Sequence, residues 1–190
     1  DAGASAGLQI DPGSGVLTWR PGAEFAGTTN AVTVIVTDSG VPSLSRSNTF
    51  QIIVGDYLEV ILGRSVMQVG QTSSVPVSVA TSTSVTNISF TVDVPFARLT
   101  NVTLQGLAPG VPAALQPAGP DRVQLVVSAT TALPSGPPLA NFGFVAPSNQ
   151  PSAFVPLLVS SPAALQANGV AVARVAARDG RVVIVGGEPL

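Results

Sequence analysis

The sequence predicts an all-β protein, and two observations carry this prediction. Apolar and polar residues alternate with a period of two over many short segments, which is typical of strands with one buried face. Gly and Pro, present 19 and 17 times, gather with Asp and Ser between those segments, where tight turns need them. Because the only helix candidate is a single turn at 162–166, we expect a β-sandwich or jelly roll.

The first part of the chain is expected to form four strands, at 8–10, 16–19, 31–37 and 49–54. The clearest of them, Ala31 to Thr37, reads AVTVIVT and is followed by a turn with Asp, Gly and Pro. Gly55-Asp56 then predicts a boundary. We therefore expect one domain over residues 1–55 and a second over 56–190.

The second part holds about nine strands in the same pattern, such as Asn87 to Val94, which reads NISFTVDV. Pro76 lies within one of them, which predicts an edge or bulged strand because Pro lacks a backbone donor. Residues 105–120, rich in Gly, Pro and Ala, predict a long loop. Asp179-Gly180 predicts a hairpin turn between the last two strands.

Composition excludes several functional classes. Charged residues make up 9% of the chain, the net charge is −2 and all eight basic residues are Arg, so nucleic acid is not an expected partner. The absence of His and Cys excludes Cys/His metal sites, Ser–His and Cys–His nucleophiles, and disulfides. No carboxylate pair has the flanking aromatic residues of a glycosidase site, so we expect no enzymatic activity.

The sequence given shows neither a membrane-spanning helix nor the features of a secretion signal. No window reaches the ~18 consecutive apolar residues of a membrane-spanning helix. The first residues contain no initiator Met, no basic region and no cleavage site. We therefore expect a segment of a longer, exported polypeptide.

Three motifs follow one another in residues 7–54: G-x-x-I-D-P-x-x-G-x-L-x-W, V-T-V-x-V-T-D and G-x-P-x-L-S. Together they resemble the later strands of the cadherin-like, Ig-like repeats of large bacterial surface proteins. The resemblance implies a domain of roughly seven strands, of which about four are present, and hence a truncated Ig-like segment. Such a segment leaves strand edges open, so we expect it to pack on the second domain or on another copy.

A second set of motifs lies in residues 57–187. The opening Leu58-Glu59-Val60 is followed by Val69-Gly70-Gln71-Thr72, by the strand VPVSV at 75–79 and by Ile88-Ser89-Phe90, and a later strand reads LANFGF. This order resembles cohesin-type domains and related carbohydrate-binding modules. The resemblance implies a nine-stranded jelly roll that serves as a non-catalytic recognition module.

Three residues are candidate site residues, and none is a candidate for catalysis. Asp38, in V-T-D-S-G-V-P, matches a cadherin-repeat Asp that binds Ca²⁺, which is the one cofactor the sequence suggests; the alternative is that Asp38 caps a turn. Trp19 and Tyr57, the single Trp and Tyr, are candidates for stacking on a sugar ring. The matched position of Trp19 favours packing in the domain instead.

These observations predict a non-catalytic, structural or adhesive segment of a large secreted or cell-surface bacterial protein. It would recognise a protein partner, or another copy of itself, through sheet faces and edges. One alternative is a cohesin-type receptor for a dockerin-like, EF-hand-type module. The other is a carbohydrate-binding module that recognises a surface glycan.

Overall fold

The computed structural model describes residues 7–107 and 110–186, and it confirms the all-β class. Within these residues the one helical element is a single 3-10 turn, η1 (Ala23–Phe25). None of the described helices is long and apolar enough to cross a membrane. The chain divides into two compact units, residues 1–56 and 57–190, here called unit 1 and unit 2.

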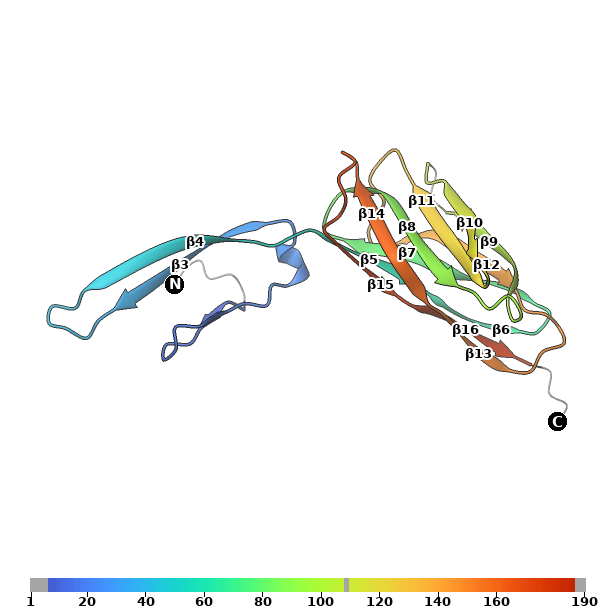
Figure 1. Cartoon of the computed structure of the whole chain (residues 1–190), viewed down its shortest axis with the longest axis horizontal. Coiled ribbons are helices and arrows are strands. Elements are labelled where there is room, and N and C mark those ends of the chain that lie inside the picture. Colours follow the sequence, from blue (N-terminus) through green and yellow to red (C-terminus); the bar gives the residue numbers. More distant parts are fainter. Residues whose placement is uncertain (1–6, 108–109, 187–190) are drawn as a thin grey trace. The chain divides into compact units, whose positions relative to one another are not determined.

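Unit 1 is built on one long hairpin (Figure 1). Its strands β3 (Thr29–Thr37) and β4 (Ser45–Ile53) pair antiparallel along their whole length without a register shift. Two very short strands, β1 (Gln9–Ile10) and β2 (Leu17–Thr18), form a separate ladder. β3 is strand-forming by composition, since seven of its nine residues are β-branched.

The apolar core of unit 1 is small. Val32 is the one hydrophobic side chain of this unit, among the described residues, that is buried. Trp19 packs edge-on against Phe25 of η1, with ring centroids 5.2 Å apart. Two exposed apolar residues lie next to each other on β3, Ile35 at 64% and Val36 at 68% exposure. The hairpin therefore keeps much of its apolar surface in water.

Unit 2 is a sandwich of two sheets in which the strands are mostly antiparallel (Figure 1). One layer has the strand order β10-β11-β8-β14 and the other has the order β15-β5-β7-β12-β9. A third, three-stranded sheet has the order β13-β16-β6. The strands are β5 (Tyr57–Leu62), β6 (Arg64–Gln68), β7 (Thr72–Thr81), β8 (Val85–Asp93), β9 (Thr100–Gly106), β10 (Ala113–Gly119), β11 (Arg122–Ser128), β12 (Pro138–Val145), β13 (Ala153–Leu157), β14 (Val159–Gln166), β15 (Arg174–Arg178) and β16 (Gly180–Val185).

The twelve segments of unit 2 amount to nine strands, because three strands are each interrupted by one residue. Gly63 separates β5 from β6, Leu158 separates β13 from β14, and Asp179 separates β15 from β16. β15 pairs in parallel with β5, and β16 continues the same parallel pairing with β6. The first and last strands thus close the sandwich, and the predicted nine-stranded jelly roll is confirmed.

The core of unit 2 follows from period-two alternation on the facing strands. Ile88, Phe90 and Val92 of β8 point inward and meet Phe142 and Phe144 of β12 in one cluster of buried residues. The two Phe rings pack edge-on at 6.1 Å. No buried side-chain nitrogen or oxygen in the described residues lacks a hydrogen-bond partner. The interior is therefore almost purely apolar.

The prediction of a hairpin at Asp179-Gly180 is wrong. The chain keeps its direction there, and Asp179 Oδ1 accepts a hydrogen bond from the Val159 amide at 2.7 Å. Gly180 is needed for close approach, since a Cβ atom there would lie 2.7 Å from the carbonyl oxygen of Gly63. Asp179-Gly180 therefore joins β15 of the five-stranded sheet to β16 of the three-stranded sheet without a turn.

Two further predictions for unit 2 are corrected. Pro76 lies on an interior strand, but at the point where β5 ends, and its carbonyl accepts the Gly63 amide at 2.8 Å. The backbone N–H that Pro76 lacks would face the position where the pairing of β7 with β5 already ends, so no ladder hydrogen bond is lost. The predicted loop over 105–120 contains β10, which pairs with β11 and has a bulge near Pro117; residues 108 and 109 lie outside the described part.

Replacing Phe90 by Ala tests the core. Phe90 is fully buried, so we expect Phe90→Ala to lower the free energy of unfolding of unit 2 by about 3–5 kcal/mol. Phe154→Ala is the matched control, because Phe154 is 62% exposed and the same atoms are removed with little loss of packing. Urea unfolding monitored by far-UV circular dichroism measures both, and equal losses would contradict the assigned core.

Candidate functional site

The outward side of the four-stranded sheet in unit 2 carries small polar side chains in register. Thr91 of β8 lies between Ser160 of β14 and Gln124 of β11, and Gln124 is paired in turn with Gln116 of β10. The next two rows mix polar and apolar residues: Ser89 lies between Ala163 and Val126, and Asn87 lies between Leu165 and Ser128. We call this surface the polar sheet face, and it consists of Asn87, Ser89, Thr91, Ala114, Gln116, Gln124, Val126, Ser128, Ser160, Ala163 and Leu165.

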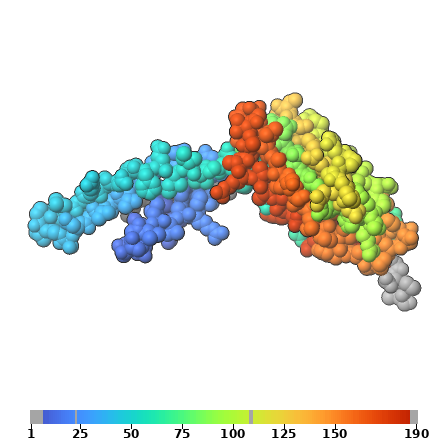
Figure 2. All heavy atoms as spheres, in the orientation of Figure 1, coloured from blue at the N-terminus to red at the C-terminus, as the bar shows by residue number. Residues whose placement is uncertain are grey.

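The face is positioned by the same alternation that builds the core. Every second residue of β8 and β11 points inward and is buried, which forces the residues between them outward. In Figure 2 this sheet faces the viewer, from β14 in orange-red to β11 in yellow. The backbone of each central strand is fully paired on both sides, so the side chains alone are available to a partner.

The polar groups of this face are not used inside the protein. Within the described residues, no side-chain hydrogen bond is made by the amides and hydroxyls of Asn87, Ser89, Thr91, Gln116 and Gln124. At one end of the sheet Arg122 Nε donates to Asp93 Oδ1 at 2.8 Å, and the two side chains are 49% and 40% exposed. An exposed pair of this kind adds little stability, but it neutralises the two charges next to the face.

The opposite surface of the sandwich differs at its centre. Pro76 of β7 and Gly143 of β12 lie on its outward side, where they offer no side-chain donor or acceptor. Towards its edge Arg178 donates to the Glu59 carboxylate through three nitrogen–oxygen contacts of 3.0 to 3.2 Å. Both sheets thus carry amides and hydroxyls on their outward sides. On this sheet Pro76 and Gly143 lie among them, and on the polar sheet face Val126 and Ala163 do.

Asp38 lies in the turn that joins β3 to β4. Its Oδ1 accepts hydrogen bonds from the amides of Leu44 at 2.9 Å and Gly40 at 3.0 Å, as the turn-capping alternative requires. These two bonds, the one from Leu44 first, hold the pKa of the Asp38 carboxyl below its ordinary value. No group of three or more His, Cys, Asp or Glu residues in the described ranges could hold a metal ion, and calcium binding stays a prediction.

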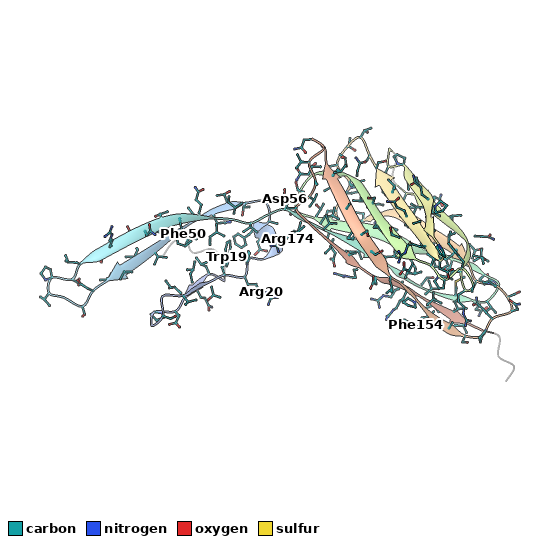
Figure 3. All side chains as sticks on the ribbon, in the orientation of Figure 1. Trp19, Arg20, Phe50, Asp56, Phe154 and Arg174 are labelled. Carbon is teal, nitrogen blue, oxygen red and sulfur yellow. The ribbon has the colours of Figure 1, made fainter. Side chains whose placement is uncertain are left out.

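Trp19 and Tyr57 belong to different units. Trp19 is half-buried next to Phe25, and Figure 3 shows it in unit 1 together with Phe50. Tyr57 begins β5, where its amide donates to Ser82 Oγ at 3.0 Å and its cross-strand neighbour is Arg174. Sugar stacking by either ring stays a prediction.

The polar sheet face was missed by the sequence analysis, although a signal for it exists. The segments NISFTVD and RVQLVVS place Asn, Ser, Thr and Gln at alternate positions between buried residues. What the sequence could not supply is the lateral order of the strands, because β14 and β11 reach β8 from distant parts of the chain.

Comparisons with known proteins agree on the fold of unit 2. No protein-family model matches the sequence, and no curated protein sequence matches it. Among solved structures, CaCohA2 of Clostridium acetobutylicum is 18% identical with a TM-score of 0.61, over 72% of this chain and 96% of its own. A non-cellulosomal cohesin of the archaeon Archaeoglobus fulgidus is 20% identical with a TM-score of 0.56, over 70% of this chain and 94% of its own.

A third similar structure comes from a type I cohesin–dockerin complex of Clostridium thermocellum. It is 7% identical with a TM-score of 0.60, over 71% of this chain and 98% of its own. At these identities the likeness shows the fold, which is the cohesin jelly roll. The cadherin-like resemblance of residues 7–54 stays a prediction.

Titration of Asp38 tests its role in the turn. Because the two amide bonds lower its pKa in the folded state, the stability that Asp38 contributes is present above the unfolded value of 3.8 and is lost as the pH falls through the folded value. We expect the carboxyl carbon of Asp38 to titrate below pH 3.8 in an NMR pH series. Asp38→Asn, which keeps an acceptor oxygen, should retain the turn but remove this pH dependence.

Addition of Ca²⁺ to the same sample tests the cadherin-type alternative. Shifts confined to the Asp38 turn that saturate with Ca²⁺ and vanish in Asp38→Asn would support a calcium site. Unchanged spectra would leave turn capping as the sole role of Asp38.

Proposed function

We propose that unit 2 is a non-catalytic protein-binding module that receives a dockerin-like domain on its polar sheet face. The observation that carries the proposal is an outward sheet face rich in amides and hydroxyls, with a few apolar residues among them, on a cohesin-type jelly roll. Several of the similar structures are cohesins in complex with dockerins, which favours this function over a general adhesive role.

The chemistry of the face suits a flat protein partner. On its central strand β8 the side chains of Asn87, Ser89 and Thr91 are short, half-buried and fixed by a paired backbone, so little conformational entropy is lost when they form hydrogen bonds. Leu165, 40% exposed, and Val126 add apolar contacts among the polar groups. Free amides and hydroxyls that become buried must find partners, which gives the interface its specificity.

Charge has a minor part in this recognition. The chain has a net charge of −2, and the nearest charges, Asp93 and Arg122, already neutralise each other. Long-range steering of a partner is therefore weak, and we expect binding to depend little on salt. The absence of His and Cys, which excludes Cys/His metal sites and Ser–His and Cys–His nucleophiles, suits a module that binds without reacting. We also propose an extracellular location, in keeping with the bacterial and archaeal cohesins of similar fold.

Two serine substitutions of matched geometry test the face. Ser89 and Ser74 are both half-buried, outward-pointing residues on interior strands, one on the polar sheet face and the other on the opposite sheet. We expect Ser89→Arg to weaken binding of a dockerin domain by about 100-fold or more, since a long charged side chain blocks the centre of the face. Ser74→Arg should bind like the original protein.

The measurement is isothermal titration calorimetry against a panel of purified dockerin domains, including those encoded in the same genome. EF-hand-type modules need Ca²⁺ to fold, so chelation with EDTA should abolish the signal and serves as a control for specificity. Binding that survives Ser89→Arg would contradict the assigned face. Absence of binding across the whole panel would contradict the dockerin-type function.

A further inference from the structure

One long edge of the unit 1 hairpin has no partner strand in the described part of the chain. β3 pairs with β4 on one side only, over nine residues from Thr29 to Thr37. Its backbone N–H and C=O groups on the other side point away from the ladder, and an edge of this kind is a template for a further strand. This surface belongs to unit 1 and is distinct from the polar sheet face of unit 2.

The edge also lacks the features that usually protect an exposed strand. β3 contains no charged residue and no Pro, and its register with β4 runs without a bulge. Ile35 and Val36, on opposite faces of the ribbon, are 64% and 68% exposed. Nothing in the strand itself therefore opposes the addition of a neighbour, and two apolar side chains would gain cover from it.

We propose that β3 pairs antiparallel with β3 of a second copy of this chain, around a two-fold axis at Thr33. In that register Val32 lies opposite Val34 of the second copy, and Ala31 lies opposite Ile35 of the second copy. Two hairpins then become one four-stranded sheet with the order β4-β3-β3-β4. The residue pairs across the new ladder contain no charged residue, and Arg46 lies one strand further out, next to Val36.

The same reasoning disfavours the other edge of the hairpin. β4 carries Arg46, so a partner on that side must accommodate a cation within the strand. β3 on β3 brings no charges together. It aligns Val32 with Val34 on one face and Ala31 with Ile35 on the other, and Val36 lies opposite Asn30. The interface is small beside the roughly 1,200–2,000 Å² of stable complexes, so the dimer is reversible and depends on concentration.

Two threonine substitutions separate the β3 edge from the rest of the hairpin. Thr33 and Thr49 are exposed cross-strand partners whose hydroxyl oxygens lie 2.8 Å apart, so either substitution by Lys removes the same hydrogen bond and adds the same charge. Thr33→Lys sets two like charges face to face at the proposed two-fold axis, whereas Thr49→Lys lies one strand away from it. We expect Thr33→Lys to raise the dimer dissociation constant about tenfold or more, and Thr49→Lys to change it less than about threefold.

Sedimentation velocity of the full chain over a series of concentrations measures the dissociation constants, and circular dichroism checks that both variants fold. A second measurement needs no variant: the amides of residues 29–37 should exchange hydrogen more slowly as the concentration of the original protein rises. A chain that stays monomeric at every concentration would overturn the proposal. So would equal weakening by the two Lys variants, or exchange in residues 29–37 that does not change with concentration.

Discussion

The structure of unit 2 depends on burial of alternate side chains between its two sheets. Phe90 from one layer and Phe142 from the other are fully removed from water, and no buried side-chain polar atom among the described residues is left unpaired. Because the period along a strand is two, fixing these residues inward fixes their neighbours outward. The polar sheet face is therefore a direct consequence of the core: a slip of one residue in β8 would bury Ser89 and Thr91 and expose Phe90.

The two units handle their strand edges differently. In unit 2 the last strand returns to pair in parallel with the first, through β15 with β5 and β16 with β6, and this closure supports a large continuous core. In unit 1 the hairpin has one buried hydrophobic residue, Val32, in its described part. An isolated two-stranded hairpin is only marginally stable in water, so further strand pairing stabilises unit 1 more than it would unit 2.

The sequence was most informative where one face of a strand is buried. Segments such as NISFTVD alternate without exception, and the all-β class and the jelly roll could be predicted from them. β10, with the sequence AALQPAG, was missed because its strand character comes from pairing with β11 and not from its own residues. Gly180 was misread for a related reason, since the close approach of Gly63 that requires it is a contact over a long distance in sequence.

The two surfaces proposed for recognition differ in their chemistry. On the polar sheet face the backbone of the central strands is already paired, so a partner would be selected by side chains whose positions the core holds fixed. At the β3 edge the side chains are uncharged and mostly β-branched, and the backbone groups are free. Affinity there would depend on backbone hydrogen bonds, which any extended strand could make. Selectivity at such an edge comes from excluding neighbouring strands that carry charged residues. β3 is uncharged and exposes Ile35 and Val36, so it is best matched by a strand of the same composition.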